Sequence, residues 1–414
     1  MGREREPHEI HADRQFTPLP QWPITGAETL PWTTTIGGLS GRQRSKILPT
    51  YEAAIVPPLA EIDAIELPGE LIADLAEAEA TIERFDATIG SSLSGFAVVA
   101  LRTEAVASSR IENLSATATS IALAEHLPRT ARSRNNAEAI AANVATLRDA
   151  MNRTGDVTPD EIEEIQRILL EEHTPKLVGI RQEQVWVGGS NYSPHGAEYV
   201  APHHDRVPAD LEDWAAFANR RDLGRLAHIA VSHAHFENIH PFADGNGRTG
   251  RVIVQRQLRS SGLTRETILP VSAGLLIDTR RYFDALTAYR QGDVAPIVAA
   301  FTGAAFATAD NSQILADELT EIRSRWTDLV TARSDSAVWP AMDAALRSPA
   351  ISATSLADEL EMSPHRARAA IDQLEEAGIL HTNSTSRRNR VWLVTDVIDA
   401  VESFMDRTQR PRTN

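Results

Sequence analysis

The sequence of 414 residues contains no cysteine. Disulfide bonds, thiolate chemistry and zinc-thiolate sites are therefore excluded. It also lacks an apolar run close to the roughly 20 residues of a membrane span, and its first residues have no apolar signal core. With 41 basic and 57 acidic side chains, the formal net charge is −16, which argues against general binding to nucleic acids or membrane surfaces. We therefore expect a cytoplasmic protein with room for two or three domains.

The most informative segment is residues 240–251, which reads His-Pro-Phe-Ala-Asp-Gly-Asn-Gly-Arg-Thr-Gly-Arg. Helix-forming sequence precedes and follows it, so we expect a loop that opens a helix, where unpaired N–H groups and the helix dipole attract anions. Gly245 and Gly247 allow backbone N–H groups to converge around a phosphate. Arg248 and Arg251 add permanent positive charge in a geometry that suits phosphate oxygens. The pattern indicates a phosphate site.

Two further side chains in this segment suit chemistry on a nucleotide. Asp244 is a hard oxygen ligand of the kind that Mg²⁺ prefers. His240 has an ordinary pKa of about 6.5, so it can be neutral near pH 7 and accept a proton from an attacking hydroxyl. Phe242 is expected to anchor the loop in the core. The segment thus combines a base, a metal ligand and groups that bind phosphate.

This segment resembles the signature motif of Fic-domain proteins. The resemblance implies a protein adenylyltransferase, a nucleotidyltransferase that uses Mg²⁺ and ATP and moves AMP to a Ser, Thr or Tyr hydroxyl of a target protein. Because relatives that act as phosphotransferases depart from glycine at the position of Gly247, that residue favours transfer of AMP. The alternative for the segment is a glycine-rich helix cap beside a buried histidine. By resemblance His240 is the general base, Asp244 the Mg²⁺ ligand, and the phosphate-binding residues are Gly245, Asn246, Gly247, Arg248 and Arg251.

A second segment, residues 108–113, reads Ser-Ser-Arg-Ile-Glu-Asn at the end of a helix-compatible run. Ser108 and Glu112 are four residues apart and so lie on one helix face. The segment resembles the inhibitory helix of many Fic proteins, a Ser or Thr followed by Glu and then Gly or Asn. That resemblance implies that Glu112 pairs with Arg251 and keeps it from the γ-phosphate of ATP, so that the chain inhibits itself. The alternative is a solvated glutamate on a helix that ends at Asn113.

Residues 184–187 and 198–200 have strand-forming sequence on either side of a turn, which predicts a β-hairpin. In Fic proteins the corresponding hairpin, the flap, aligns a target segment by strand addition. Trp186, Tyr192 and Tyr199 are therefore candidate contacts to the target, and packing across the strands is the alternative.

Other histidines are expected to be structural. We interpret His203 and His204 as surface residues, because we find no acidic or thiol partner at metal-ligand spacing. His228, His233 and His235 precede His240 on one predicted helix, but no pair has the spacing of a zinc-binding helix. We expect them to pack between helices.

The C-terminal part differs in character. Residues 355–380 read as a helix, a turn and a second helix, with Ser363 as the cap of the second helix and Pro364 at its first position. A polar segment and the apolar run 391–394 follow. This resembles a winged helix-turn-helix module. From residue 340 onward there are 9 arginines and 11 acidic residues (9 − 11 = −2), so DNA contact would have to be local. The alternative is a module for protein interaction or dimerisation. The candidate DNA contacts are Arg366, Arg368, Arg387, Arg388 and Arg390.

We therefore predict a mainly α fold: a helical Fic core with a small β-hairpin flap, plus the winged helix-turn-helix domain. Helices are expected over 60–89, 209–220, 294–309 and 312–332, among others. The expected parts are an extended N-terminal arm (1–45), a helical module with the inhibitory helix (46–130), the catalytic core (131–310), a linking helix (311–340) and the C-terminal domain (341–414).

Several partners and activities stay open on the sequence alone. The target protein is unidentified, and self-modification is expected because Fic proteins often modify themselves. A second copy of the chain and duplex DNA are further candidate partners, and no membrane partner is expected. One alternative function is a DNA-binding transcriptional regulator with a Fic fold. Another is removal of AMP by the same site, with Glu112 orienting a water.

Overall fold

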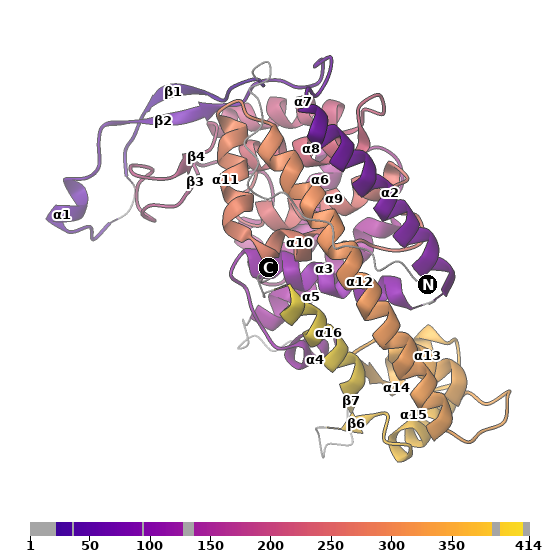
Figure 1. Cartoon of the computed structure of the whole chain (residues 1–414). Helices are drawn as coiled ribbons and strands as arrows, with labels where there is room; N and C mark the ends of the chain where they lie inside the picture. Colours follow the sequence, from indigo (N-terminus) through magenta and orange to yellow (C-terminus); the bar gives the residue numbers. More distant parts are fainter. Residues whose placement is uncertain (1–21, 35–36, 93–94, 127–135, 383–389, 409–414) are drawn as a thin grey trace.

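The computed structural model describes residues 22–34, 37–92, 95–126, 136–382 and 390–408. The chain is mainly helical, with three small antiparallel sheets in the described part (Figure 1). None of the described helices is both long enough and apolar enough to cross a membrane.

Two antiparallel neighbours, α8 (Arg225–Ile239) and α9 (Asn246–Ser260), form the centre of the helical body and are buried along almost their whole length. Some of their polar side chains form hydrogen bonds inside the core: Gln257 donates to the carbonyl of Ala218 (3.2 Å) and to the hydroxyl of Ser232 (3.0 Å). The loop between them is residues 240–245. The surrounding helices are α3 (Phe96–Ile111), α4 (Ala118–His126), α5 (Asn136–Asn152), α6 (Pro159–Leu170), α7 (Val207–Ala218), α10 (Val271–Ile277) and α11 (Thr279–Arg290).

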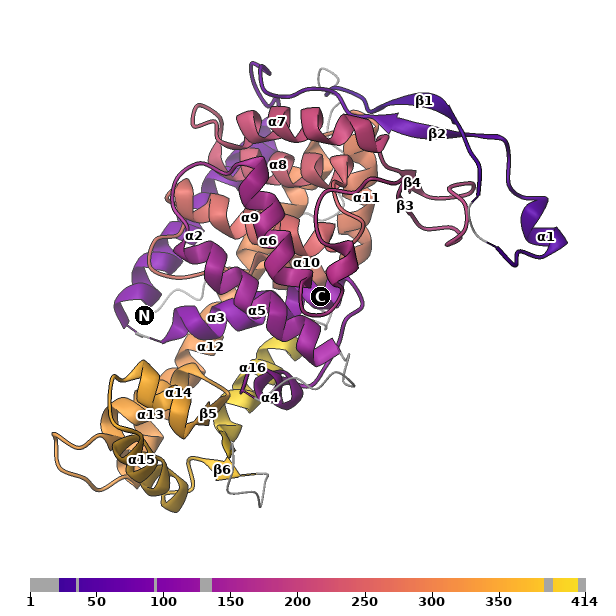
Figure 2. The ribbon, with the colours of Figure 1, turned by 180° about the vertical axis from the view of Figure 1, so that it is seen from behind.

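One long helix, α12 (Ala295–Leu329), connects this body to the C-terminal elements (Figures 1 and 2). The sequence predicts two helices with a break near residue 310, and this is wrong. The polar residue Asn311 does not end the helix, because its side chain serves a tertiary contact. It donates to the carbonyl of Phe404 (3.2 Å) and accepts from Nε of Arg407 (2.5 Å), both on α16 (Thr395–Arg407).

The predicted helix over 60–89 begins later than expected. The structure has α2 at Gly69–Ser92, directly after Pro68. Along this helix Leu71, Leu75 and Ile82 are buried, but Ile72 is 53% exposed.

An N-terminal ribbon stands away from the helical body (Figures 1 and 2). It consists of β1 (Gly26–Pro31) and β2 (Thr50–Ile55), which pair in antiparallel register from Gly26↔Ile55 to Pro31↔Thr50, and of the short α1 (Gly41–Arg44) between them. This pairing was not predicted. The ribbon contacts the predicted hairpin, which is present as β3 (Trp186–Val187) and β4 (Tyr199–Val200).

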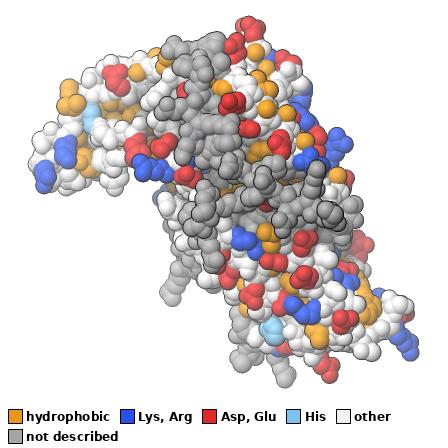
Figure 3. Space-filling model, viewed as in Figure 1, with side chains coloured by type: hydrophobic (Ala, Val, Ile, Leu, Met, Phe, Trp, Pro, Cys, Tyr) orange, Lys and Arg blue, Asp and Glu red, His pale blue; other side chains and the backbone are white. Residues whose placement is uncertain are grey.

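The C-terminal elements combine four helices with a three-stranded sheet of order β5-β7-β6. The strands are β5 (Ala350–Ser352), β6 (His381–Thr382) and β7 (Val391–Leu393), and the first three helices are α13 (Val338–Arg347), α14 (Ala353–Glu359) and α15 (Pro364–Glu376). Ser363 caps α15 by accepting from the backbone N–H of Arg366. Arg387 and Arg388 lie outside the described residues. Acidic and basic side chains are interspersed on the face of this region shown in Figure 3.

Candidate active site

The loop between α8 and α9 is held rigidly from several sides. His240 ends α8 in the left-handed conformation (φ 51°), and its carbonyl accepts from Nε of Arg181 (2.8 Å). The side-chain amide of Asn246 accepts from the N–H of Phe242 (2.9 Å) and donates to its carbonyl (3.0 Å), while the Phe242 ring is fully buried. The predicted anchoring role of Phe242 is therefore confirmed. The Asn246 side chain fixes the loop, and the assignment of this residue to the phosphate cradle stays a prediction.

His240 is half-buried in a setting that favours its neutral form. Burial, and the nearby charges of Arg181 and Arg290, lower its pKa to about 4. Its Nδ1 lies 3.3 Å from the carbonyl of Glu237. A proton on Nδ1 would satisfy this carbonyl and leave Nε2 as the acceptor. The side chain is thus prepared to take up a proton.

The first turn of α9 has the features of an anion site. Gly245 caps the helix with a φ of 85°, and the first N–H groups of a helix have no acceptor within it. Arg248, in the same turn, is only 6% exposed, and its Nε has no hydrogen-bond partner among the described residues. A buried guanidinium N–H without an acceptor is costly unless a ligand supplies one. A phosphate oxygen is such an acceptor, so these residues fit the phosphates of a nucleotide.

Asp244 lies at the open side of this turn. Its side chain is 45% exposed, and Oδ1 accepts from the N–H of Gly245 (2.7 Å). The second oxygen, Oδ2, is 3.5 Å from a terminal nitrogen of Arg248. An exposed carboxylate oxygen beside a phosphate site fits a Mg²⁺ ion that bridges to substrate oxygens.

Arg251 lies one turn further along α9 and is fully engaged with the end of α3. Its Nε donates to Oγ of Ser108 (2.9 Å). One terminal nitrogen donates to the backbone carbonyl of Ser108 (2.8 Å) and to Oε1 of Glu112 (2.8 Å). The Arg251 side chain is 2% exposed and that of Glu112 is 37% exposed. The structure therefore contains the expected pair of Glu112 and Arg251, and Ser108 forms part of it.

The position of Glu112 follows from how α3 ends. Asn113 adopts a left-handed conformation (φ 60°), its N–H donates to the carbonyl of Arg110 (2.9 Å), and the N–H of Leu114 donates to the carbonyl of Ser109 (3.0 Å). These two bonds form a Schellman motif, which requires a residue such as Gly or Asn at the left-handed position. Asn113 thus terminates the helix and leaves Glu112 at its last turn, facing α9.

The carboxylate of Glu112 lies directly on the first turn of α9. A Cβ atom added to Gly247 would be 1.9 Å from Oε1 of Glu112, so only glycine leaves room for this contact. Burial of Glu112 alone would raise its pKa, but the charge of Arg251, its hydrogen bond, and the charge of Arg248 together hold the pKa below the ordinary value. Glu112 is therefore an internal anion at the helix N-terminus.

A buried acid that the sequence reading missed faces the same arginine. Glu237 is 7% exposed, and burial raises its pKa to about 7 against the opposing charge of Arg251. Its Oε1 lacks a hydrogen-bond partner among the described residues. The signal in the sequence was the single acidic residue of α8, three positions before His240.

Comparison with known proteins agrees with this geometry. Residues 156–258 match the model of the Fic/DOC family. The chain is 32% identical over 145 residues to protein adenylyltransferase fic-1 of Caenorhabditis briggsae, and 31% identical over 144 residues to protein adenylyltransferase Fic of Drosophila melanogaster. Residues 156–258 of this chain therefore match a Fic/DOC domain. Each alignment covers 34% of this chain but only 26% and 27% of the two relatives, about a quarter of their length.

A solved structure shares the fold over a larger part of this chain. The crystal structure of a Fic family protein from Desulfovibrio desulfuricans superposes with a TM-score of 0.53, covering 80% of this chain and 97% of that chain at 20% identity. The fold is thus a mainly helical Fic fold with small β sheets.

The hairpin of β3 and β4, the predicted flap, presents fewer aromatic side chains than expected. The Tyr199 ring is buried, its hydroxyl donates to the carbonyl of Asn238, and the guanidinium of Arg290 lies 3.8 Å above it. The expectation that Tyr199 contacts a target is therefore wrong in this conformation, because the ring packs into the core. Trp186 is half-buried against Trp32, with ring centroids 5.6 Å apart. Tyr192 is partly exposed.

Histidines outside the Fic motif divide into two groups. His228, His233 and His235 are buried, and each has one ring nitrogen within hydrogen-bonding distance of a carbonyl or tyrosine oxygen, as expected for packing residues. The reading of His203 and His204 needs correction, because Asp205 follows them directly. One ligand atom from each of these three residues lies within 4.8 Å of the others.

Two aromatic residues near the site also differ in burial. Tyr282 is buried, with its hydroxyl 2.7 Å from Nε2 of His233, whereas Phe283 is 47% exposed.

In the C-terminal region, Arg368 and Arg390 contact the same side chain. Their guanidinium groups lie 4.6 Å and 4.8 Å from the ring centre of Trp392. They also pair with Asp372 (2.9 Å) and Glu375 (2.8 Å), respectively. Among the candidate DNA contacts in the described part of the chain, Arg366 alone makes no hydrogen bond or ion pair through its side chain. The assignment to DNA stays a prediction.

Proposed function

We propose that this protein transfers AMP from ATP to a hydroxyl side chain of a target protein, and that Glu112 holds the resting chain inactive. The observation that supports the activity is the combination of a neutral His240 with a buried Arg248 that lacks an acceptor at the N-terminus of α9. The relatives named as protein adenylyltransferases share the Fic domain, which supports the same reaction.

In the proposed reaction the target oxygen attacks the α-phosphorus of ATP. Nε2 of His240 accepts the hydroxyl proton as the new P–O bond forms. The bond from the α-phosphorus to the oxygen that bridges to the β-phosphate breaks, and pyrophosphate leaves. The N–H groups at the start of α9 and the Arg248 guanidinium would hold the phosphates. Asp244 would hold Mg²⁺, which would neutralise phosphate charge when bound.

The proposed inhibition follows from the position of Glu112. Its carboxylate lies on the backbone of Gly247, where a phosphate group would approach, and it engages Arg251 (2.8 Å). A bound phosphate would have to displace a like charge and separate a largely buried ion pair. ATP would therefore bind poorly, or in a pose unsuited to attack.

Target docking is assigned to the flap and the C-terminal region. Val187 is 39% exposed on β3, beside the partly exposed Trp186 and Tyr192, and an extended target segment would align along this edge. We further infer that residues 338–407 form a winged helix-turn-helix module, because a helix-turn-helix pair is followed by a small antiparallel sheet.

A second candidate activity is removal of AMP from a modified protein. It is favoured by one observation: the Glu112 carboxylate is partly exposed and close enough to His240 to influence its pKa. A carboxylate in that position would orient an attacking water. Loss of this activity in Glu112→Gly, with a gain of AMP transfer, would separate the two reactions.

The direct test of transfer is the intact mass of the protein after incubation with Mg-ATP. Glu112→Gly should gain one AMP unit, whereas the double variant Glu112→Gly with His240→Ala should not. Equal labelling of the two variants would rule out His240 as the base.

A further inference from the structure

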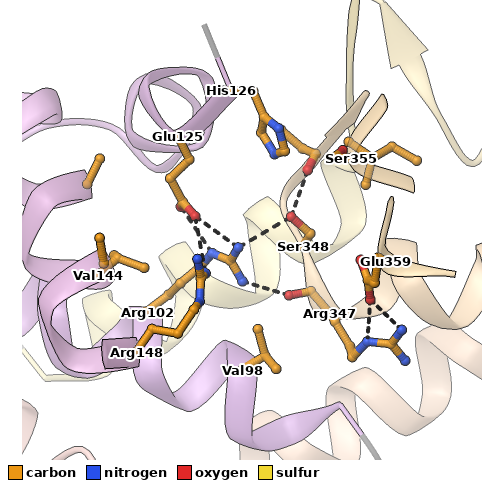
Figure 4. Close-up of a pocket in the computed structure, with 14 residues that line it drawn as sticks. Val98, Arg102, Glu125, His126, Val144, Arg148, Arg347, Ser348, Ser355 and Glu359 are labelled. Carbon is orange, nitrogen blue, oxygen red and sulfur yellow. Dashed lines mark hydrogen bonds and ion pairs between the residues drawn. The ribbon is translucent and has the colours of Figure 1, made fainter. Parts of the chain in front are cut away.

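A cavity lies away from the Fic motif, at the junction of the helical body and the C-terminal elements (Figure 4). Its volume is about 340 Å³, which lies in the range of small-molecule sites. Its walls come from α3, α4 and α5 on one side and from the end of α13, β5 and α14 on the other. Nothing in the proposed reaction uses this cavity.

The polar wall of the cavity contains one more arginine than it has carboxylates. Arg102 is buried and fully engaged: it donates to both oxygens of Glu125 (3.1 Å and 3.0 Å) and to the carbonyl of Arg347 (2.8 Å). Arg347 in turn pairs with Glu359. Figure 4 shows both pairs at the cavity wall.

Arg148 is the remaining cation. Its side chain is 53% exposed. One of its terminal nitrogens lies 3.8 Å from Oε2 of Glu125. That oxygen already accepts from Arg102 at 3.0 Å. His126 adds no positive charge near pH 7, because burial lowers its pKa. The cavity therefore carries an unbalanced positive charge at Arg148.

Apolar side chains form another part of the lining. Val98, Ala141, Val144 and Ile351 line the cavity, and the last three are buried. A ligand that fits this wall has an organic body for the apolar surface and an anionic head for Arg148.

We propose that this cavity binds a small organic anion, one that carries a carboxylate or phosphate group. The bound molecule would contact α3 and the C-terminal elements together. Arg102 and Val98 belong to the helix whose other end carries Ser108 and Glu112, so the ligand would meet the helix that controls Arg251. The binding itself does not depend on the proposed function.

The test uses the full chain and three probes: citrate, benzoate and phenyl phosphate, titrated by calorimetry at constant ionic strength. We expect at least one probe to bind the wild type saturably at one site that the variants below affect. Arg148→Gln removes the unbalanced charge. Ala145→Glu adds an exposed carboxylate to the rim, one helical turn from Arg148. Each change should weaken binding at least tenfold.

Arg280→Gln is the matched control, because Arg280 is 92% exposed and lies outside the cavity. It should bind the probe as the wild type does. Hydrogen exchange with the probe bound should show protection in residues 98–102, 141–148 and 347–355. The proposal is overturned if no probe binds, if Arg148→Gln binds as tightly as the wild type, or if the protection falls elsewhere. Circular dichroism of each variant verifies that it is folded.

Discussion

Oε1 of Glu112 occupies the space in which a side chain at position 247 would have to begin, 1.9 Å from the position of an added Cβ atom of Gly247. Glycine at this position therefore has two consequences. It exposes the backbone at the start of α9 to an anion, and it admits the carboxylate of the chain itself. The start of α9 and the end of α3 thus meet in a space the size of one atom.

Release of this contact does not require α3 to unfold. The helix is buried along most of its length, and Asn143 donates to the carbonyl of Ala105 (3.0 Å) and to Oγ of Ser109 (3.2 Å). Glu104 of the same helix accepts from the N–H of Ser272 (2.9 Å). Glu112, by contrast, is 37% exposed at the end of the helix. Rotation of this one side chain is the smaller motion.

Replacing Gly247 with alanine should expel Glu112 and break its pair with Arg251. We expect the free energy of unfolding to fall by about 1–3 kcal/mol, the usual cost of overpacking. In the Glu112→Gly background the cost of the same change should be smaller, because the close atom that remains is a terminal nitrogen of Arg251 at 2.9 Å, the end of a flexible side chain. Denaturant unfolding of the four proteins gives the coupling energy.

Gly303→Ala is the control for this cycle. Gly303 is also helical, and nothing lies within 4 Å of its added Cβ. It should give the same small effect with and without Glu112. Additive costs for Gly247→Ala and Glu112→Gly would contradict the contact.

Ser108→Ala should release inhibition only in part. The change removes one acceptor from Nε of Arg251, but the carbonyl of Ser108 and the Glu112 carboxylate remain. Hydrogen bonds to charged groups contribute about 1.5–3 kcal/mol, so we expect AMP transfer to rise about tenfold, less than in Glu112→Gly. Ser109→Ala is the neighbouring control, because its hydroxyl donates to Ala105 and not to Arg251. Equal effects of the two serine changes would argue against the predicted role of Ser108.

The pH dependence of transfer should reflect the shifted pKa of His240. A base must be unprotonated, and burial places the pKa of His240 at about 4. Removing Glu112 takes away a charge that raises this pKa. The acid limb of kcat/KM for Glu112→Gly should therefore lie near pH 4 or below, with no loss between about pH 5 and 8 from this group. An acid midpoint near 6.5 would show that His240 is solvated.

Loss of folding stability at acid pH limits how far down in pH the rate of AMP transfer can be measured. Burial lowers the pKa values of His233 and His235 to about 3 as well. Below about pH 6.5 the unfolded chain binds protons at these histidines and the folded chain does not, so their contribution to stability is present above that pH and falls as the pH is lowered. Circular dichroism at each pH identifies the range in which rates are valid.

The fold and the motif could be predicted from the sequence to different extents. The loop at 240–251 was recognisable because its glycines, acid and arginines have fixed spacing. Tyr199 was misjudged because β-strand sequence does not state which face is buried, and its partner Arg290 is far away in the chain. The sequence predicted a helix break at residues 309–312 because it does not show that Asn311 has a tertiary partner on α16. Such errors come from long-range contacts that override local propensity.

In the C-terminal region, two neighbouring arginines should differ in their effect on stability. Arg368 stacks on Trp392 and pairs with Asp372, so Arg368→Ala should cost about 0.5–1 kcal/mol. Arg366→Ala should leave the thermal midpoint unchanged while reducing binding of the full chain to duplex DNA, if the module reads DNA. Binding of DNA that survives Arg366→Ala would remove this residue from the candidate contacts.

The most direct test is a comparison of AMP transfer from labelled Mg-ATP by wild type, Glu112→Gly and Glu112→Gly with His240→Ala. We predict little label on the wild type, at least tenfold more on Glu112→Gly, and none on the double variant. A wild type as active as Glu112→Gly would contradict the claim that Glu112 on Gly247 and Arg251 holds the enzyme off.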